Sequence, residues 1–329
     1  MGAGRASGGV TNGIVLGRFM PLHTGHIALI RTARALVDHL TVVICWQADD
    51  PVPAEQRLRW MMEMFPSIRV VAVDCPPPRD LPDREDAERL EAQLRDLHRA
   101  PIDRLIASDR RQSDLAAALD ARFVLIDPDH QAVPVTSAAI RADPIGHWRF
   151  VPPAVRPRYA RTICLHGPES TGKSTLTLRL ARHFDTLYVP EYGRTYCEQY
   201  GLSLQMEDLV TIGRTHAAMT QALMRQCNQR LFLDTDPLMT AAWADMLFGR
   251  RDPWFDDFQG TADLYLLMDI DLPWIDDGTR FFGDDDRRGR FFDLSRAELD
   301  RRGLEYRIIG GPPEERFDRA LQAIADAGL

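Results

Sequence analysis

Short apolar runs alternate with amphipathic segments along the first half of the chain. The apolar runs predict strands at 13–16, 41–46, 69–73, 104–108 and 122–126. Between them, apolar residues recur with helical spacing at 27–36, 55–65, 86–100 and 115–119. Regular alternation of strands and helices predicts an α/β fold, in which helices cover both faces of a parallel sheet.

The same alternation returns in the second half, around a second set of strands. Strands are predicted at 162–165, 186–190, 230–234, 264–268 and 305–309, and helices at 176–184, 208–229 and 312–327. Proline and glycine are dense in 143–153, which is typical of a junction between domains. We therefore predict a flexible tail at 1–12, a first domain at 13–151, a linker at 152–160 and a second domain at 161–329.

Composition and charge exclude several classes of protein. Hydrophobic residues make up 45% and charged residues 27% of the 329 residues, which is ordinary for a soluble globular protein. No apolar run approaches the roughly 18 residues of a membrane helix, so we expect no membrane insertion. A net charge of −8 argues against duplex nucleic acid as the main partner.

The cysteines and the first residues bear on the compartment. The five cysteines are scattered and form no C-x-x-C pair, which favours a reducing compartment and predicts neither a disulfide framework nor a zinc site. The first residues lack the apolar core of a signal peptide. We therefore expect a cytoplasmic location.

Residues 167–175 form a complete G-x-x-x-x-G-K-[ST] phosphate loop between an apolar strand and a helical segment. Its glycines let the backbone curl until successive N–H groups face phosphate oxygens. Lys173 is expected to reach the β- and γ-phosphates, and the Ser174 hydroxyl to bind Mg²⁺. The alternative, a glycine-rich turn without a ligand, is disfavoured by the complete pattern. We predict ATP and Mg²⁺ as cofactors, held by Gly167, Glu169, Ser170, Thr171, Gly172, Lys173, Ser174 and Thr175.

A second motif follows the first strand. The sequence Gly17-Arg-Phe-Met-Pro-Leu-His23-Thr-Gly-His26 joins that strand to a helix, and it places two imidazoles at the helix N-terminus. Such an end attracts a polyphosphate, and two histidine donors there could stabilise charge on a transferring phosphoryl group. Structural histidines are the alternative.

Three further groups of charged residues are candidates in the second half. Asp234 and Asp236 end an apolar strand at the position expected for Mg²⁺ ligands; since alternate residues share one side of a strand, both could serve the metal. A plain strand-end turn is the alternative. Glu191 and Arg194 could contact a sugar hydroxyl and a phosphate, or form a surface ion pair. Arg287 and Arg288 lie in a segment rich in Gly and Asp, which we interpret as a mobile lid or a solvated charged loop.

The motif at residues 17–26 resembles the G-x-F-x-P-x-H-x-G-H signature of the nucleotidylyltransferase superfamily. Those enzymes use a Rossmann-like parallel sheet to transfer a nucleotidyl group from a nucleoside triphosphate. Residues 135–141 resemble their second signature, I-S-x-T-x-I-R, although Ala138 replaces its threonine. The resemblance implies that Arg141 binds the triphosphate tail, and that Gly17, Phe19 and Gly25 belong to the nucleotide site.

The order of the motifs resembles one family closely. A nucleotidylyltransferase unit ending in Ile-Arg-x-x-Pro…His-Trp-x-Phe is followed at once by Gly-x-Glu-Ser-Thr-Gly-Lys-Ser-Thr, as in the bifunctional nicotinamide-nucleotide adenylyltransferase/ribosylnicotinamide kinases of the NadR type. The resemblance implies phosphorylation of nicotinamide riboside to its mononucleotide (NMN), followed by adenylyl transfer from ATP to NMN, giving NAD and pyrophosphate. It implies a catalytic set of His23, His26, Arg141, Lys173, Asp236 and Glu191, metal ligands Ser174, Asp234 and Asp236, and substrate contacts Arg57, Tyr192, Arg194 and Trp274.

Several alternatives stay open. Packing explains Arg57 as well as a substrate contact does. The same two folds could serve another nucleoside kinase joined to another nucleotidylyltransferase. The first domain could also be a sensor of NAD and ATP that regulates a partner such as a riboside transporter, because Ala138 removes a hydroxyl donor. Some family members carry an N-terminal helix-turn-helix domain; only about a dozen residues precede the first strand here, so the resemblance implies no DNA binding. Homo-oligomer formation stays open.

Overall fold

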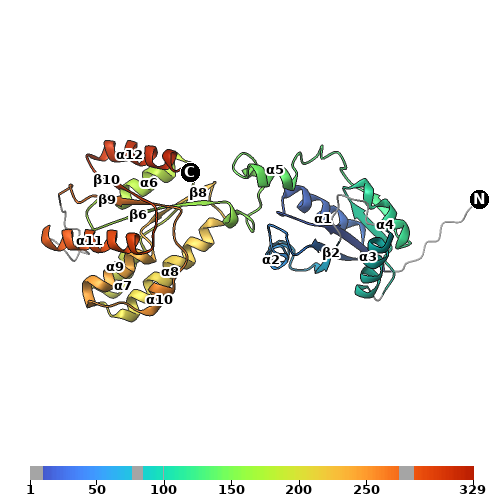
Figure 1. Cartoon of the computed structure of the whole chain (residues 1–329), viewed down its shortest axis with the longest axis horizontal. Helices are drawn as coiled ribbons and strands as arrows, with labels where there is room; N and C mark the ends of the chain where they lie inside the picture. Colours follow the sequence, from blue (N-terminus) through green and yellow to red (C-terminus); the bar gives the residue numbers. More distant parts are fainter. Residues whose placement is uncertain (1–9, 76–83, 99, 274–284) are drawn as a thin grey trace, which may run out of the picture. The chain divides into compact units, whose positions relative to one another are not determined.

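The computed structural model describes residues 10–75, 84–98, 100–273 and 285–329. The chain divides into two compact units, Met1–Val155 and Arg156–Leu329 (Figure 1). This division falls inside the predicted linker at 152–160. Each unit contains a five-stranded sheet whose paired strands all run parallel, so the predicted α/β class is confirmed for both halves.

The sheet of the first unit has the order β3-β2-β1-β4-β5, so the direction of winding reverses between β1 and β4. Ligands bind at such a reversal, beyond the carboxyl ends of the strands. Ile14, Val43 and Leu105 are fully buried in the core of the sheet. The strands are β1 (Asn12–Gly17), β2 (His39–Trp46), β3 (Arg69–Asp74), β4 (Arg104–Ala107) and β5 (Arg122–Leu125); the helices are α1 (Thr24–Leu36), α2 (Ala54–Met64), α3 (Arg84–Leu97), α4 (Ser113–Ala118) and α5 (Ser137–Ala142).

The second unit repeats this plan with the strand order β10-β9-β6-β8-β7. Helices α6 and α12 lie on one face of the sheet, and α8, α9 and α11 lie on the other (Figure 1). The winding reverses between β6 and β8, again at a ligand-binding position. The strands are β6 (Arg161–His166), β7 (Tyr188–Val189), β8 (Arg230–Asp234), β9 (Leu264–Met268) and β10 (Tyr306–Ile309); the helices are α6 (Lys173–His183), α7 (Tyr192–Tyr200), α8 (Met206–Met224), α9 (Pro237–Phe248), α10 (Pro253–Asp257), α11 (Asp285–Arg301) and α12 (Pro313–Asp326).

Several helices differ from the sequence expectation, and α9 and α11 show two different reasons. Helix α9 is apolar on all sides because α8 and α11 cover it, so it lacks the one-sided pattern by which a helix is recognised. Helix α11 contains Arg287 and Arg288, and the prediction of a loop at these residues is wrong. Its first turn carries Asp285 and Asp286, whose charges stabilise a helix N-terminus.

A disulfide joins Cys45, near the end of β2, to Cys75, directly after β3. The two strands are neighbours, and Cys45 pairs in register with Val73. A separation of 30 residues along the chain conceals this proximity. The expectation that the cysteines form no disulfide is therefore wrong for this pair, whereas Cys164, Cys197 and Cys227 are free.

The sequence predicts no membrane-spanning segment. Within the described residues, no helix has both the length and the apolar character that crossing a membrane requires.

Candidate active sites

The turn after β1 builds the first candidate site. Phe19 has a positive φ of 49°, and the peptide bond that follows Met20 is cis. A Cβ atom on Gly17 would lie 3.1 Å from the Phe19 ring, so glycine lets that ring fold back over the strand end. The Phe19 ring meets His26 edge-on, with the ring centroids 4.9 Å apart. The turn therefore fixes an aromatic wall beside the N-terminus of α1.

His23 and His26 lie together at this N-terminus, as the sequence predicts. The His23 Nδ1 atom accepts the Gly25 N–H at 3.2 Å and caps α1. Its proton is therefore on Nε2, which leaves that N–H for a ligand. The two imidazoles stack with centroids 3.7 Å apart. A Cβ atom on Gly25 would lie 3.0 Å from the His23 ring, so a larger residue at this position would require the ring to shift.

Burial keeps both imidazoles neutral. It lowers the pKa of His23 to about 4, with a smaller contribution from nearby His130. It also lowers the pKa of His26 well below the ordinary value, and His23 and His130 lower it further. At neutral pH each ring thus offers one N–H donor without a full charge, which is the form in which a buried imidazole can bind a phosphate oxygen.

The histidines line a pocket of about 290 Å³ together with the loop after β5 and the start of α5. His130 lies on that loop and also lines the pocket. The Asp127 carboxylate organises the loop by accepting the N–H groups of Gln131 at 2.7 Å and Ala132 at 3.2 Å. His130 belongs to neither signature, so no motif spacing marks it as a site residue.

The second signature contributes less to the pocket than the resemblance implies. The Thr136 hydroxyl accepts the Ala139 N–H at 3.1 Å as the cap of α5, and the Ser137 hydroxyl donates to the Pro21 carbonyl at 3.1 Å. Ala138 has no hydroxyl. Arg141 is exposed and donates to the Met20 carbonyl, and it is not among the residues that line the pocket. Its role as a triphosphate ligand stays a prediction.

Arg57 is buried beneath the same turn. Its guanidinium donates to the carbonyl oxygens of Arg18 at 2.9 Å and Cys45 at 3.0 Å, and to the Asp50 carboxylate at 2.6 Å. Asp50 also pairs with Arg18. These contacts connect α2 to the ends of β1 and β2, so the structure gives Arg57 a packing role and does not place it in the pocket.

The phosphate loop follows β6 and leads into α6, as predicted. Gly167 and Gly172 have φ values of 123° and 81°, which other residues rarely adopt. A Cβ atom on Gly167 would also lie 3.0 Å from the Met268 carbonyl oxygen. The Lys173 ammonium donates to the Pro168 carbonyl at 2.7 Å, and the Thr171 hydroxyl donates to the same oxygen at 2.8 Å.

A pocket of about 590 Å³ opens beside the loop, between α7, α8 and the end of β8. It brings Glu191 and Arg194 together, with Glu191 Oε2 3.8 Å from Arg194 Nε. The sugar-site and ion-pair interpretations are therefore compatible. The predicted residues that line the pocket are Glu169, Ser170, Thr171, Gly172, Lys173, Ser174, Thr175, Glu191, Arg194 and Asp234.

Besides Gly167 and Asp236, four predicted residues do not line this pocket or lie outside the described residues. Tyr192 packs against the core between α7 and α8, next to Tyr196. Arg287 is exposed on α11, whereas Arg288 is buried there and donates to the Leu272 carbonyl at 3.0 Å. Trp274 lies outside the described residues.

The two carboxylates at the end of β8, Asp234 and Asp236, lie in different surroundings. Asp234 lines the pocket, and burial raises its pKa to about 6, with nearby Glu191 raising it further and Lys173 lowering it. Asp236 instead caps α9, where it accepts the Met239 N–H at 3.1 Å and the Tyr265 hydroxyl at 2.6 Å. Thr235, with a φ of 69°, turns the chain between them. The expectation that both carboxylates share one side of a strand is therefore wrong.

His216 on α8 also lines this pocket, although the sequence analysis did not select it. Its side chain is 2% exposed, and neither ring nitrogen makes a hydrogen bond within the part of the chain that the structure describes. Burial lowers its pKa. A lone histidine inside an amphipathic helix has no sequence signal that separates it from a core residue, so only the fold shows that it faces the pocket.

The residues around Asp234 suit Mg²⁺. Asp234 Oδ1 is buried without a hydrogen-bond partner among the described residues, and Ser174 lines the same pocket. Oxygen ligands of this kind are those that Mg²⁺ takes beside a nucleotide. Ser174 and Asp234 could therefore hold the ion, whereas Asp236 lies outside this pocket.

Comparison with known families supports both folds. A cytidylyltransferase-like family model matches residues 14–77, and an AAA domain model matches residues 162–316. Two crystal structures of a NadR protein, one in complex with NR and one in complex with NAD and AMP-PNP, each superpose with a TM-score of 0.77 at 23% identity. The first covers 97% of this chain and 96% of its own; the second covers 98% and 97%. These likenesses establish the two-domain fold.

Curated relatives extend over nearly the same length. The trifunctional NAD biosynthesis/regulator protein NadR of Escherichia coli (strain K12) is 29% identical across 96% of this chain and 83% of its own. NadR of Salmonella typhimurium (strain LT2) is 30% identical across 95% of this chain and 82% of its own. A relative that is 30% identical over nearly the whole chain shows the family, and we conclude that the chain belongs to the NadR family.

Proposed function

We propose that this chain makes NAD in two ATP-dependent steps, one in each unit. The second unit transfers the γ-phosphoryl group of ATP to the 5′-hydroxyl of nicotinamide riboside, giving NMN. The first unit transfers the adenylyl group of another ATP to NMN, giving NAD and pyrophosphate. The observation that carries the proposal is that a stacked histidine pair and a phosphate loop, each in its own pocket, occur in one chain of the NadR family.

In the phosphoryl-transfer step, the loop N–H groups and Lys173 hold the β- and γ-phosphates of ATP. Ser174 and Asp234 would hold Mg²⁺, which would neutralise charge on those phosphates. Glu191 lines the same pocket as the loop, and in this proposal it orients the riboside hydroxyl and accepts its proton. Arg194, adjacent to Glu191, adds positive charge near the transferred group.

In the adenylyl-transfer step, a phosphate oxygen of NMN attacks the α-phosphorus of ATP. One P–O bond forms, and the bond to the pyrophosphate leaving group breaks. No proton needs to move and no covalent enzyme intermediate is required, so positioning and electrostatic stabilisation suffice. His23 and His26 donate N–H groups to the triphosphate at the N-terminus of α1.

A second role for the first unit is favoured by one observation. The Ser137 hydroxyl donates to the Pro21 carbonyl and Ala138 has no hydroxyl, so of these three residues only Thr136, which accepts the Ala139 N–H, keeps its donor. A site with fewer free donors could bind NAD and ATP and regulate a partner without turnover. The cytoplasmic location belongs to the proposal because both steps consume ATP; transporter coupling and oligomer formation do not belong to it.

A product assay separates these functions. Purified protein is incubated with Mg²⁺, ATP and nicotinamide riboside, in parallel with Lys173→Ala and His26→Ala. The proposal expects NAD from the parent, accumulation of NMN with His26→Ala, and neither product with Lys173→Ala. A parent that stops at NMN would assign the sensor role to the first unit, and untouched riboside would overturn the substrate assignment.

A further inference from the structure

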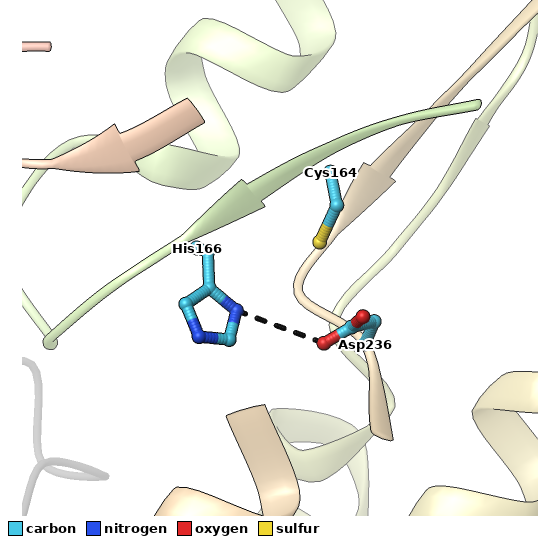
Figure 2. A group of neighbouring side chains, drawn as sticks. All are labelled: Cys164, His166 and Asp236. Carbon is cyan, nitrogen blue, oxygen red and sulfur yellow. Dashed lines mark ion pairs between the residues drawn. The ribbon is translucent and has the colours of Figure 1, made fainter. Parts of the chain in front are cut away.

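Three side chains with metal-binding atoms meet at the end of β6, just before the phosphate loop begins. Cys164 and His166 are two residues apart on this strand and so share one side of it. Asp236 comes from the start of α9, and all three side chains point into the same space (Figure 2). One ligand atom from each residue lies within 4.8 Å of the other two, and all three residues are buried. The proposed transfer steps use none of them.

The His166 imidazole is buried with both ring nitrogens lacking a hydrogen bond among the described residues. Its side chain is 0% exposed. Its Nδ1 lies 3.7 Å from Asp236 Oδ1. Hydrogen bonds of this type span about 2.7–3.2 Å. Two nitrogen or oxygen ligands of one tetrahedral zinc ion lie roughly 3.4 Å apart, since each is about 2.0–2.2 Å from the metal. The two side chains form an ion pair at this distance (Figure 2), and the same separation also fits two ligands of one shared ion.

Charge balance also favours a divalent ion. Without a metal, burial and the nearby Asp236 and Asp234 carboxylates hold the pKa of the Cys164 thiol well above its ordinary value. With a divalent ion bound, a thiolate and the Asp236 carboxylate would balance its two positive charges, and a neutral His166 would add none. Buried charges need this kind of compensation because no water reaches them. The combination of sulfur, nitrogen and oxygen donors suits zinc, whereas Mg²⁺ prefers oxygen ligands alone.

We propose that Cys164, His166 and Asp236 supply three ligands to one zinc ion beneath the phosphate loop. On binding, the Cys164 thiol releases its proton to solvent, and the sulfur–metal bond forms. Tyr265 orients the carboxylate by donating to Asp236 Oδ2, and the Met239 N–H donates to Oδ1, which leaves one lone pair of Oδ1 for the metal. The ion connects β6 to α9 directly before Gly167. Cysteine spacing predicted no zinc site, because the cluster forms only when β6 and β8 pair.

Cadmium is the probe for this site, because a thiolate–cadmium bond gives an ultraviolet charge-transfer band. The full chain is refolded with Cd²⁺ in the presence of Mg²⁺ and freed of loose metal by gel filtration. The band and the bound metal are then measured for the parent, Cys164→Ala, Cys164→Ser and His166→Leu. Cys227→Ala is the matched control, because Cys227 is also a buried free cysteine of the second unit and is not part of the cluster. A Cys45→Ser/Cys75→Ser background removes the disulfide of the first unit, whose two sulfurs could otherwise bind Cd²⁺ when reduced.

The proposal expects one Cd²⁺ or Zn²⁺ per chain, a band that is lost in both Cys164 variants, and binding weakened about 10- to 100-fold by His166→Leu. Cys227→Ala and the double-serine background keep the band. Circular dichroism identifies variants that fold, and Cys164→Ser preserves side-chain size if Cys164→Ala does not fold. A parent without stoichiometric metal overturns the proposal. A band that persists in a folded Cys164 variant, or disappears in the double-serine background, overturns it equally. Riboside phosphorylation is not part of the readout, so the proposed function can fail independently.

Discussion

Asp234 and Asp236 are two positions apart in the sequence, yet their carboxylates lie in different surroundings. The left-handed backbone of Thr235 turns Asp234 toward the phosphate-loop pocket and Asp236 toward Tyr265 and the first turn of α9. The two acids are therefore expected to fail differently when they are replaced.

Asp234→Asn should lower riboside phosphorylation roughly 100-fold or more with little loss of stability, because it removes the charged oxygens that face the nucleotide. Asp236→Ala should lower the free energy of unfolding by about 2–4 kcal/mol, because it removes a helix cap and strands the Tyr265 hydroxyl. Steady-state kinetics and urea denaturation test the pair. Equal losses of stability in both variants would contradict the separation.

The raised pKa of Asp234 predicts a pH dependence of nucleotide binding. Since the carboxyl titrates at about 6, Mg²⁺-dependent binding of an ATP analogue should weaken as the pH falls through 6. Stability should move in the opposite direction, because between about pH 4 and 6 the folded protein binds a proton that the unfolded chain has released. Calorimetric titration measures the binding. Glu191→Gln removes a neighbouring charge that raises this pKa, so it should shift the transition to lower pH.

His23 should make the first unit sensitive to acid. Its folded-state pKa of about 4 lies below the ordinary 6.5, so the unfolded chain binds the proton more readily between these values. The stability that it contributes is complete above pH 6.5 and is lost as the pH falls toward 4, by at most about 3 kcal/mol. His23→Asn keeps a capping acceptor without a titrating ring and should flatten this dependence. Hydrogen exchange of α1 between pH 5 and 7.5 measures it, and an unchanged slope would remove His23 as the cause.

Gly25→Ala tests whether the stacked histidines need their spacing. The new Cβ atom would lie 3.0 Å from the His23 ring and displace it, so NAD formation from NMN should fall about tenfold or more while riboside phosphorylation is unchanged. Gly289→Ala is the control, because a Cβ atom there meets nothing within 4 Å, and it should stabilise α11 by about 0.5–1 kcal/mol. Full NAD formation by Gly25→Ala would show that the stacked arrangement is dispensable.

Residues within contiguous patterns were predictable from the sequence. The family, both folds and nearly all strands were predicted, because strands carry apolar runs and the two nucleotide motifs each combine a glycine-bearing turn with the start of a helix. The residues at those turns lie where the motifs place them, as His23, His26 and Lys173 show.

Features that depend on tertiary contacts were not predictable. Helix α9 has no polar face, so periodicity could not find it. His130 and His216 lack motif partners, and only folding brings them to the pockets. The Cys45–Cys75 pair depends on the neighbouring positions of β2 and β3. A single positive φ at Thr235 reversed the expected direction of Asp236, and alternation along a strand cannot anticipate such a turn.

The contact between Lys173 and the Pro168 carbonyl has a consequence for affinity. A nucleotide that recruits the ammonium must break this bond, so binding is an exchange of one partner for another and its measured strength is the difference between the two. A single phosphate replaces little of the free energy of the broken Lys173–Pro168 hydrogen bond. A triphosphate replaces more of it, because β- and γ-phosphate oxygens can contact the ammonium together. We therefore expect the loop to bind a triphosphate more tightly than a shorter phosphate chain.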